Sequence, residues 1–393
     1  MKKRNIAIVD FNQPAIGVGG VETVGHLLKN GLLENGYKVW SLFFYQKSEK
    51  SDTDIEFPEK STIDNKINLE FLIKTIEQLG IGILVLQGGY KKDIIKLCAK
   101  AKERVGIKLI YPIHFHPLMG LKEYDDYCER YIQQSKTPLA RVMRSIYCKS
   151  KHIVFTINNM KRARREHCDS LFNSIDAFVL LTQKYADIAK TLYDKKLQEH
   201  FYTIANPIEL DEQVQNNEKE NIVLFVGRLT YQKRIDRLLH IWKNLHCQFP
   251  KWKLVIVGDG DYSNEYKSIS KDLCLENIEY VGQQPAASFF QKSKIVCLTS
   301  SYEAQPMVLI EAQKYGCVPI AYNSFEAATD IIREEYNGLL IKPFKHKKYT
   351  KALTRLMSDE NLRQQLAKNG LEHIKKFNIS TIIQEWINLF NRL

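Results

Sequence analysis

Short apolar runs of strand length alternate with amphipathic segments along the whole chain. The apolar runs occupy residues 5–11, 38–44, 81–88, 107–114 and 176–182, and later residues 221–227, 253–260, 278–282, 294–300 and 318–323. Segments between them, such as 21–36 and 91–106, space their apolar residues three and four positions apart, which is typical of helices packed on one face. This alternation predicts parallel sheets with helices on both faces.

The pattern stops and restarts around a polar connector at 206–220. A chain of 393 residues is long enough for two or three domains. We therefore predict an α/β fold with two doubly wound units, an N-terminal domain over 1–205 and a C-terminal domain over 206–377. Ligands of open parallel sheets bind outside the carboxyl ends of the strands, so candidate chemistry is expected at strand ends.

Composition favours a soluble globular protein, because 44% of the residues are hydrophobic and 26% are charged. No run approaches 18 apolar residues, and Asp10 interrupts the first run, so the start of the chain is a strand rather than a signal peptide. The eight cysteines are scattered without C-x-x-C spacing, which favours free thiols in a reducing compartment. We expect a cytoplasmic protein.

The net charge of +12 is uneven, with +9 in residues 1–205. From Lys136 to Arg165 there are nine basic residues and no acid. This segment is a solvated surface, or it binds an anionic membrane or nucleic acid. Its cations alternate with apolar and aromatic residues as in an interfacial segment, and no nucleic-acid recognition motif accompanies them. We expect it to contact an anionic membrane surface or the acceptor, and no nucleic acid.

Two loops at strand ends carry residues suited to phosphate. "GVGGVE" at 17–22 opens a helix, where small residues and free N–H groups let the backbone approach an anion. A plain tight turn explains it equally well. "VGRLTYQKR" at 226–234 places Arg228 and Lys233 in one loop, where two cations suit a diphosphate.

"SYEAQPMVLIEA" at 301–312 holds two carboxylates eight positions apart, with Glu311 inside an apolar helical run. Pro306 suits the first helical position. A buried glutamate needs a polar partner. A nucleotide sugar offers one, because Glu303 before the helix could meet sugar hydroxyls while Glu311 meets the ribose.

These motifs occur in a fixed order: a Gly-rich first loop, a strand-ending His114, G-R-L-x-x-x-K at 227–233, G-D-G at 258–260, E-x7-E at 303–311 and N-G-L-L at 337–340. In this order the chain resembles the retaining glycosyltransferases of family 4, of the bacterial surface-polysaccharide and lipopolysaccharide type. The resemblance covers nearly the whole chain and is strongest over 222–343. It implies the GT-B fold, with two Rossmann-like domains facing an interdomain cleft and a C-terminal helix at about 378–393 packing back on the N-terminal domain.

The resemblance also implies residue roles. The catalytic set would be Glu303 on the transferred sugar, Arg228 and Lys233 on the departing diphosphate, and His114 near the donor sugar. The donor-binding set would be Gly19, Gly20, Val281, Gly282, Ala304, Gln305, Pro306, Met307 and Glu311. Within it, the glycines of the first loop face the diphosphate, the backbone at 281–282 meets the base, and Glu311 holds the ribose. His116 is a rival for the histidine role.

Two departures from the family pattern stand out. Ala304–Gln305 replaces a glycine and a variable residue, which leaves the identity of the sugar open. Arg234 follows Lys233 where glycine is common, and it either adds a charge near the phosphates or faces solvent.

Metal binding has two candidate motifs, the D-x-D triplets at 52–54 and 259–261. Asp259 is expected to form a turn. With Arg228 and Lys233 available for the charge, we expect neither a catalytic metal nor a cofactor. The motif supplies no carboxylate nucleophile of the kind that double displacement needs. We therefore expect front-face substitution, in which the leaving phosphate accepts the acceptor's proton.

The sequence thus predicts a retaining, metal-independent hexosyltransferase. It would move a UDP-linked hexose or N-acetylhexosamine to a glycan or lipid-linked acceptor in cell-surface polysaccharide synthesis, at the inner face of the cell membrane. Alternatives are a sugar-nucleotide epimerase or a phosphorylase on the same fold, and a basic membrane-binding or nucleic-acid-binding module. An NAD(P)-dependent oxidoreductase is a weaker alternative, since G-x-G-x-x-G is absent from the sequence.

Overall fold

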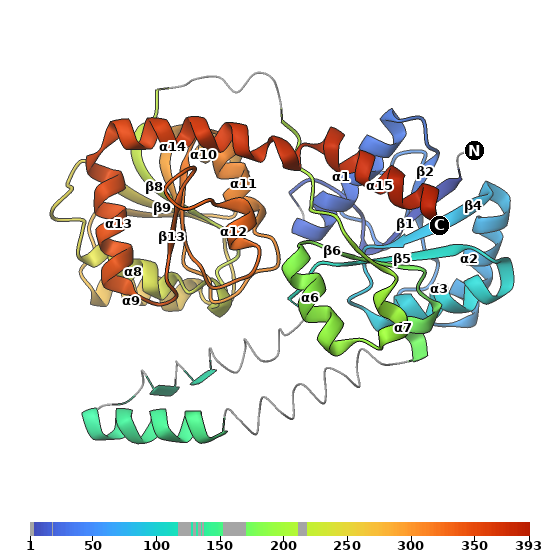
Figure 1. Cartoon of the computed structure of the whole chain (residues 1–393), viewed down its shortest axis with the longest axis horizontal. Coiled ribbons are helices and arrows are strands. Elements are labelled where there is room, and N and C mark those ends of the chain that lie inside the picture. Colours follow the sequence, from blue (N-terminus) through green and yellow to red (C-terminus); the bar gives the residue numbers. More distant parts are fainter. Residues whose placement is uncertain are drawn as a thin grey trace. The chain divides into compact units, whose positions relative to one another are not determined.

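The computed structural model describes residues 4–17, 19–116, 127–128, 131–132, 135, 137–151, 170–210 and 218–393. The chain forms two compact units (Figure 1). The first comprises Met1–Pro117, Ile157–Glu209 and Phe377–Leu393, and the second comprises Leu118–Thr156 and Leu210–Lys376.

The first unit is built on a seven-stranded parallel sheet in the order β3-β2-β1-β4-β5-β6-β7. Its strands are β1 (Asn5–Asn12), β2 (Val39–Tyr45), β3 (Asp54–Glu56), β4 (Ile81–Leu86), β5 (Lys108–Ile113), β6 (Ala177–Leu180) and β7 (Phe201–Thr203). The strand order reverses between β1 and β4, where Val9 lies beside Leu86. Such a reversal opens a crevice at the carboxyl ends of the two strands, the usual ligand site of this fold.

Helices flank this sheet. They are α1 (Gly20–Glu34), α2 (Lys66–Leu79), α3 (Lys92–Val105), α6 (Gln183–Leu192), α7 (Lys195–Gln198) and α15 (Ile379–Arg392), with a 3-10 turn at Ser170–Ser174. Figure 1 shows the C-terminal helix α15 beside α1. Ile382, Ile383 and Trp386 of α15 share a buried apolar cluster with Leu28 and Leu32 of α1. The last helix of the chain therefore belongs to the core of the first unit.

The second unit has a six-stranded parallel sheet in the order β10-β9-β8-β11-β12-β13. Its strands are β8 (Glu220–Val226), β9 (Lys253–Val257), β10 (Ile278–Gly282), β11 (Ser293–Leu298), β12 (Val318–Tyr322) and β13 (Leu339–Ile341). Its helices are α8 (Ile235–Lys243), α9 (Ser263–Asp272), α10 (Ala287–Lys292), α11 (Met307–Lys314), α12 (Ala328–Ile331), α13 (His346–Ser358) and α14 (Glu360–His373), with 3-10 turns at Tyr231–Lys233 and Ile374–Phe377. Here the strand order reverses between β8 and β11.

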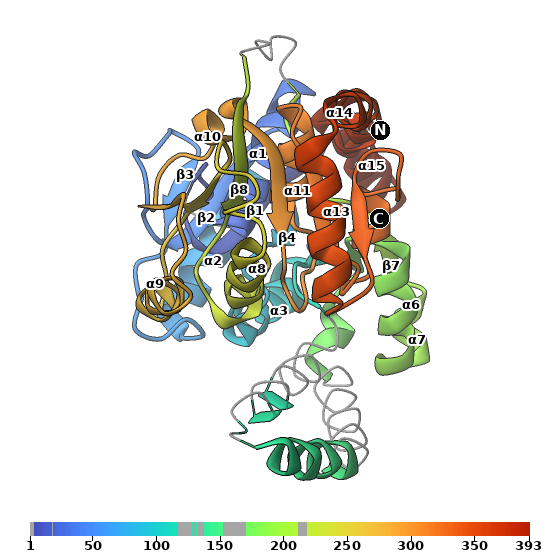
Figure 2. The ribbon, with the colours of Figure 1, turned by 90° about the vertical axis from the view of Figure 1, so that its left-hand side faces the viewer.

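Successive residues of the central strands of this sheet face opposite layers of helices. Val223 and Phe225 join the cluster formed with α8, α9 and α13, which face the viewer in Figure 2. Ile222 and Leu224 join the cluster formed with α10 and α11. Both faces of β8 are therefore buried, as is usual for a central strand of a parallel sheet covered by helices.

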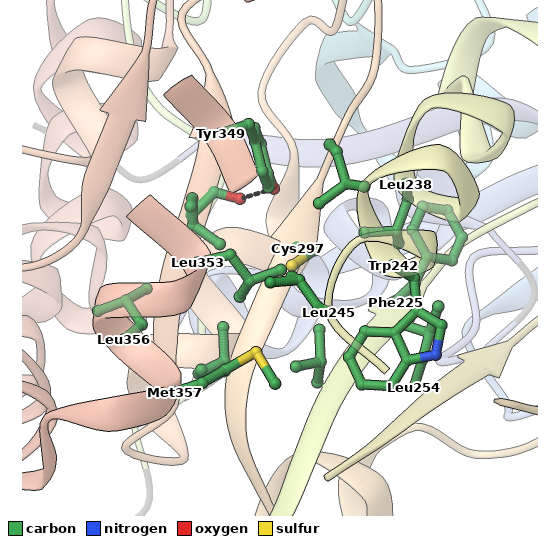
Figure 3. Close-up of a cluster of buried hydrophobic side chains, with 14 of the residues drawn as sticks. Phe225, Leu238, Trp242, Leu245, Leu254, Cys297, Tyr349, Leu353, Leu356 and Met357 are labelled. Atoms are coloured by element: carbon green, nitrogen blue, oxygen red, sulfur yellow. Dashed lines mark hydrogen bonds between the residues drawn. The ribbon is translucent and has the colours of Figure 1, made fainter. Parts of the chain in front are cut away.

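Trp242 of α8 anchors the larger of these two clusters (Figure 3). Its side chain is fully buried, and its indole N–H donates to the Glu276 carbonyl at 3.0 Å. On the same side of the sheet, the Tyr349 hydroxyl of α13 donates to the Ile320 carbonyl at 2.8 Å. The buried polar groups of Trp242 and Tyr349 thus each have a hydrogen-bond partner.

The predicted fold class is confirmed, since both units are doubly wound parallel sheets. Sequence periodicity missed helix α2 and the three-residue strands β3, β7 and β13. Over the described parts of the chain, no helix combines the length and apolarity needed to cross a bilayer. Of the eight cysteines, the seven in these parts are free thiols.

Candidate functional site

Two loops meet at the point where the strand order of the second unit reverses. The first loop follows β8, and the second follows β11. The Ser301 backbone N–H donates to the Gln232 carbonyl at 2.9 Å, and the Gln232 side chain donates to the Tyr302 carbonyl at 2.7 Å. The Thr299 hydroxyl donates to the Arg234 carbonyl at 3.0 Å. These hydrogen bonds hold the two loops in a fixed relation at the carboxyl edge of the sheet.

This contact brings together two of the predicted catalytic residues. Lys233 Nζ lies 2.6 Å from Glu303 Oε1, and the two side chains are 18% and 9% exposed. An ion pair this short and this protected from water is a charge-assisted hydrogen bond. The lysine ammonium carries three donors, so it retains capacity for an anion while it pairs with the carboxylate.

Arg228 lies in the same loop with an exposed side chain. Among the described residues, its guanidinium makes no hydrogen bond or ion pair. Arg228 therefore belongs to the same loop as Lys233, and the planar donor face of its guanidinium is available to an anion.

Glu311 is the acid that the sequence places inside an apolar helix. It lies one turn into α11, and within the described parts of the chain its carboxylate has no hydrogen-bond partner. Burial raises the pKa of this carboxyl, while Lys314 opposes the rise. A desolvated carboxylate without a partner is costly, and a ligand that donates two hydroxyl hydrogens would satisfy it.

The residues Ala304, Gln305, Pro306 and Met307 form the entry to α11. Pro306 is the capping residue and the helix begins at Met307, so the prediction that Pro306 is the first helical residue was wrong by one position. The first N–H groups of a helix have no partner within it, and they point toward any anion at this end.

The structure corrects both interpretations of Arg234. Its side chain is fully buried, so it does not face solvent. Its guanidinium pairs with Asp236, 2.9 Å from Nη2 to Oδ2, and lies 4.8 Å from the centre of the Tyr231 ring. The charge is therefore neutralised inside the protein rather than offered to a phosphate. With a φ of 49°, Arg234 also fixes the left-handed turn into α8, a conformation that favours glycine.

Val281 and Gly282 end β10, at the edge of the same sheet. The Gly282 carbonyl accepts from the Gly258 N–H at 2.8 Å, and Gly282 has a φ of 73°. The two residues therefore lie at the same carboxyl edge as Lys233 and Glu303. Their contact with a base stays a prediction.

Neither D-x-D triplet presents its acids as a pair. Asp259 accepts hydrogen bonds from the Gly260 N–H and the Ser263 hydroxyl, so it forms the predicted turn. Asp54 forms a 2.6 Å ion pair with Lys29, and both side chains are buried. In the described ranges, no three His, Cys, Asp or Glu side chains lie close enough together to hold a metal ion.

The first unit carries the remaining predicted residues. Gly19 and Gly20 open α1, and a Cβ on Gly20 would meet no atom within 4 Å, so the backbone there is open to a ligand. Glu22 lies in the same first turn, and an anion bound there would face its negative charge. The rival His116 is buried against the ring of Tyr185, with 5.3 Å between ring centres, which indicates a structural role.

His114 follows β5 and pairs through Nε2 with the side-chain oxygen of Gln87. Burial lowers the pKa of His114 to about 4. Sequence reasoning missed Gln87 and the neighbouring buried Asp10 as site residues. The positions of Asp10 and Gln87 in the sequence could have indicated this, because each is a polar residue at the end of an apolar run.

Known proteins are similar to this chain in sequence and in fold. Residues 208–373 match the family model described as "Glycosyl transferases group 1". The amylovoran biosynthesis glycosyltransferase AmsD of Erwinia amylovora is 37% identical over 175 residues, which are 44% of this chain and 49% of that protein. An α-1,4-N-acetyl-D-galactosaminyltransferase of Campylobacter jejuni, named for a diphospho-undecaprenol-linked acceptor, is 30% identical over 50% of this chain and 56% of its own length. The chain thus spans about half the length of these curated relatives.

The fold match extends over both units. The crystal structure of Anabaena Alr3699/HepE in complex with UDP-glucose aligns with a TM-score of 0.73 at 15% identity, and it covers 99% of this chain and 100% of that one. At this identity the match supports the fold alone. Together, these findings confirm the resemblance to glycosyltransferases of the GT-B fold that the ordered motifs predict.

Proposed function

We propose that this chain, whose residues 208–373 match the group 1 glycosyl transferases, is a retaining glycosyltransferase that uses a nucleotide-sugar donor. The donor would be a UDP-linked hexose or N-acetylhexosamine. The acceptor would be a glycan or a lipid-linked glycan in the synthesis of a cell-surface polysaccharide. The names of AmsD and of the Campylobacter jejuni transferase support this pathway.

The observation that carries the proposal is the Lys233–Glu303 pair at the strand reversal, with the unpartnered Glu311 on the following helix. Lys233 supplies positive charge for a diphosphate, and Glu303 supplies an acceptor for sugar hydroxyls. Glu311 supplies a second acceptor for the ribose. A nucleotide sugar carries all three groups, with the diphosphate between the sugar hydroxyls and the ribose hydroxyls.

The proposed reaction is a front-face substitution. The bond between the anomeric carbon and the diphosphate oxygen breaks, and a bond to the acceptor oxygen forms on the same face of the sugar. The acceptor's proton passes to the leaving diphosphate oxygen. Lys233 and Arg228 stabilise the charge that develops on that oxygen, which is the largest contribution this site offers to catalysis.

Metal independence is part of the proposal. Lys233 and Arg228 together supply two positive charges, enough to balance the diphosphate charge that a divalent cation balances in other transferases. We therefore expect turnover to persist in EDTA.

We further propose that the enzyme is cytoplasmic and binds the inner face of the cell membrane through the basic segment 136–165. Residues 152–165 lie outside the described part of the chain. In the helical residues 138–151, five apolar side chains are 50–71% exposed, namely Leu139, Val142, Met143, Ile146 and Tyr147. Their spacing places them on one face of the helix. The cations Arg141, Lys149 and Lys151 lie on the same helix, so the charge suits anionic lipid headgroups.

The test is nucleoside-diphosphate release from UDP-, GDP- and ADP-sugars in EDTA, with and without membrane extract as acceptor. We expect slow release from one UDP-sugar alone and faster release with extract. NMR of the product should show the anomeric configuration of the donor retained. Conversion of the donor to an epimer would instead favour the epimerase alternative. If no nucleoside diphosphate is released from any of these donors, and nucleotides do not raise the melting temperature, the proposal is contradicted.

A further inference from the structure

The strand reversal of the first unit holds polar side chains that the proposed function leaves without a role. Asp10 and Gln87 each come one residue after the paired Val9 and Leu86 of β1 and β4. The Gly88 N–H donates to the Val9 carbonyl at 3.1 Å, so the strands stay together here. Neighbouring positions of parallel strands project to the same face, which places both side chains at the crevice of this sheet.

Gln87 is 1% exposed and uses only half of its hydrogen-bonding capacity. Its Oε1 pairs with His114 Nε2, and its Nε2 is buried without a partner. Such an unsatisfied buried donor destabilises the folded protein. An apolar side chain of the same size would avoid this cost, so the single bond to His114 is what Gln87 contributes.

That bond determines which nitrogen of His114 carries the hydrogen. An amide oxygen only accepts hydrogen bonds, so the paired Nε2 must be the N–H. Burial lowers the pKa of His114 to about 4, so the ring is neutral at pH 7 and holds one hydrogen. Nδ1 therefore carries a lone pair, and the described residues provide no hydrogen-bond donor to it.

We propose that Gln87 is a positioning residue that holds His114 in the neutral Nε2–H tautomer, so that Nδ1 accepts a hydrogen bond from a hydroxyl of bound carbohydrate. The carbohydrate part of this inference rests on the proposed function, and the tautomer part does not. A diphosphate at neutral pH has no hydrogen to donate, whereas every carbohydrate carries hydroxyl groups that do. The hydroxyl belongs either to the donor sugar or to the acceptor.

The charged and titratable groups at this crevice come from three elements. Asp10 of β1 is buried, with a pKa raised by desolvation to about 8, and its Oδ1 accepts from the Phe11 N–H at 2.6 Å. Glu22 of α1 accepts from the Asn12 side chain at 2.8 Å. Tyr90, which follows β4, has its pKa raised to about 12 by burial and by these two carboxyl groups. Asp10 titrates near neutral pH, and Asp10→Asn removes that titration.

The first test reads the tautomer directly by long-range ¹H–¹⁵N correlation on ¹⁵N-histidine-labelled full-length protein. The His114 signals are identified by their loss in His114→Gln. We expect a neutral ring with hydrogen on Nε2 between pH 6 and 8, and a mixture of tautomers in Gln87→Met. Ser41→Ala, which removes a buried hydroxyl without a partner on β2, is the matched control and should leave the spectrum unchanged. A charged ring, a hydrogen on Nδ1, or an unchanged spectrum in Gln87→Met would overturn the proposal.

The second test asks whether a carbohydrate hydroxyl uses Nδ1. Adding UDP-glucose or UDP-N-acetylglucosamine, or either with membrane extract, should shift the Nδ1 signal, whereas UDP alone should not. Absence of any shift while donor is turned over would reject the hydroxyl contact. A shift with donor alone identifies the donor sugar as the source, and a shift that needs extract identifies the acceptor.

Kinetics separate a positioning role from a structural one. A carboxylate in Gln87→Glu stabilises the protonated imidazole and raises the pKa of His114. With Asp10→Asn in both proteins, kcat/KM should fall more steeply between pH 8 and 5 in Gln87→Glu than in the protein that keeps Gln87. In the latter the pKa of His114 stays at about 4, and the remaining decline reflects Glu311. In Gln87→Met, KM for the sugar substrate should rise about 3- to 10-fold, with UDP affinity unchanged. If no donor is turned over, the proposed function is wrong, whereas the tautomer of His114 is still decided by the NMR spectra.

Discussion

Lys233 and Glu303 are 70 residues apart in sequence and form one ion pair at the carboxyl edge of the second sheet. In the free protein, each side chain satisfies the other. A bound nucleotide sugar would share them, with the lysine reaching the diphosphate and the glutamate reaching the sugar. The ion pair therefore holds the Lys233 ammonium and the Glu303 carboxylate in a desolvated, preorganised geometry before the donor binds.

Replacing Lys233 should separate catalysis from stability. In Lys233→Ala we expect turnover to fall at least 100-fold, because the charge on the leaving diphosphate loses its main partner. The unfolding free energy should fall by about 1–3 kcal/mol, because the mostly buried carboxylate of Glu303 loses its ion pair with Lys233. Thermal unfolding and donor release measure the two effects.

The double variant Lys233→Ala/Glu303→Gln is the control for that experiment. Removing the charge of Glu303 as well should restore much of the stability but none of the activity. A single variant that keeps wild-type turnover would contradict the catalytic role of Lys233.

Glu311 should give donor binding a pH dependence. Burial raises the pKa of this carboxyl, so its charged form is lost at a higher pH than for an ordinary glutamate. Since the carboxylate is the form that accepts two ribose hydroxyls, UDP affinity should weaken as pH falls through that raised pKa. Titration calorimetry between pH 5 and 8 tests this.

The matched variant for that experiment is Glu311→Gln, which keeps the shape and removes the titration. It should bind UDP more weakly than wild type at pH 8 and with no pH dependence. Identical pH profiles for the two proteins would assign the dependence to another group.

At the scale of elements, helix α15 is joined to the first unit by close contact with α1. Gly31 of α1 has no space for a larger residue, since a Cβ there would lie 2.5 Å from Ile383 Cγ1. The apolar residues of α15 fill a buried cluster that also includes Ile6 and Ile8 of β1. The C-terminal helix therefore supports the strand whose end carries Asp10.

Gly31→Ala should loosen this contact and lower the unfolding free energy of the first unit by about 1–3 kcal/mol, as overpacking usually does. Gly20→Ala is the control, because the added Cβ meets no atom within 4 Å. Differential scanning calorimetry and limited proteolysis of the C-terminus report the difference. Suppression of the defect by Ile383→Val would confirm the contact, and equal melting temperatures for Gly31→Ala and wild type would contradict it.

Periodicity in the sequence predicted the long elements because each has one or two buried faces. The strands β1, β8 and β11 begin within one residue of their predicted starts. The three-residue strands β3, β7 and β13 are too short to show a period, and they take their place from pairing with a neighbouring strand. Their positions are set by hydrogen bonding to the neighbouring strand, which the local sequence pattern does not show.

The candidate site divides in the same way. Sequence order singled out Lys233, Glu303 and Glu311, because the first two follow strands and the third is an acid inside an apolar helix. It could not assign Arg234, whose burial depends on Asp236 and Tyr231 in the folded loop. It also missed Gln87, because a hydrogen bond to a residue 27 positions away leaves no local mark.

At the scale of the whole molecule, membrane binding is predicted to need both charge and apolar surface. Vesicles of phosphatidylglycerol and phosphatidylethanolamine should bind the protein, and affinity should fall with salt because surface charges are screened. The double variant Met143→Asp/Ile146→Asp should weaken binding at least 10-fold. Co-sedimentation measures each effect.

A matched control replaces exposed apolar residues elsewhere, Ile67→Asp and Leu371→Asp, which are 59% and 43% exposed. These changes should leave vesicle binding unchanged. Equal binding by all variants, or binding to neutral phosphatidylcholine vesicles alone, would contradict an electrostatic interfacial segment.

The most direct test of the central claim is calorimetric binding of UDP in EDTA, with wild type, Glu311→Ala and the surface control Glu335→Ala. The account predicts that wild type and the control bind UDP equally and that Glu311→Ala binds at least 10-fold more weakly, about 1.4 kcal/mol or more. If wild type binds neither UDP nor another nucleoside diphosphate, or if Glu311→Ala binds UDP as tightly as wild type, the second unit does not hold a nucleotide sugar as described.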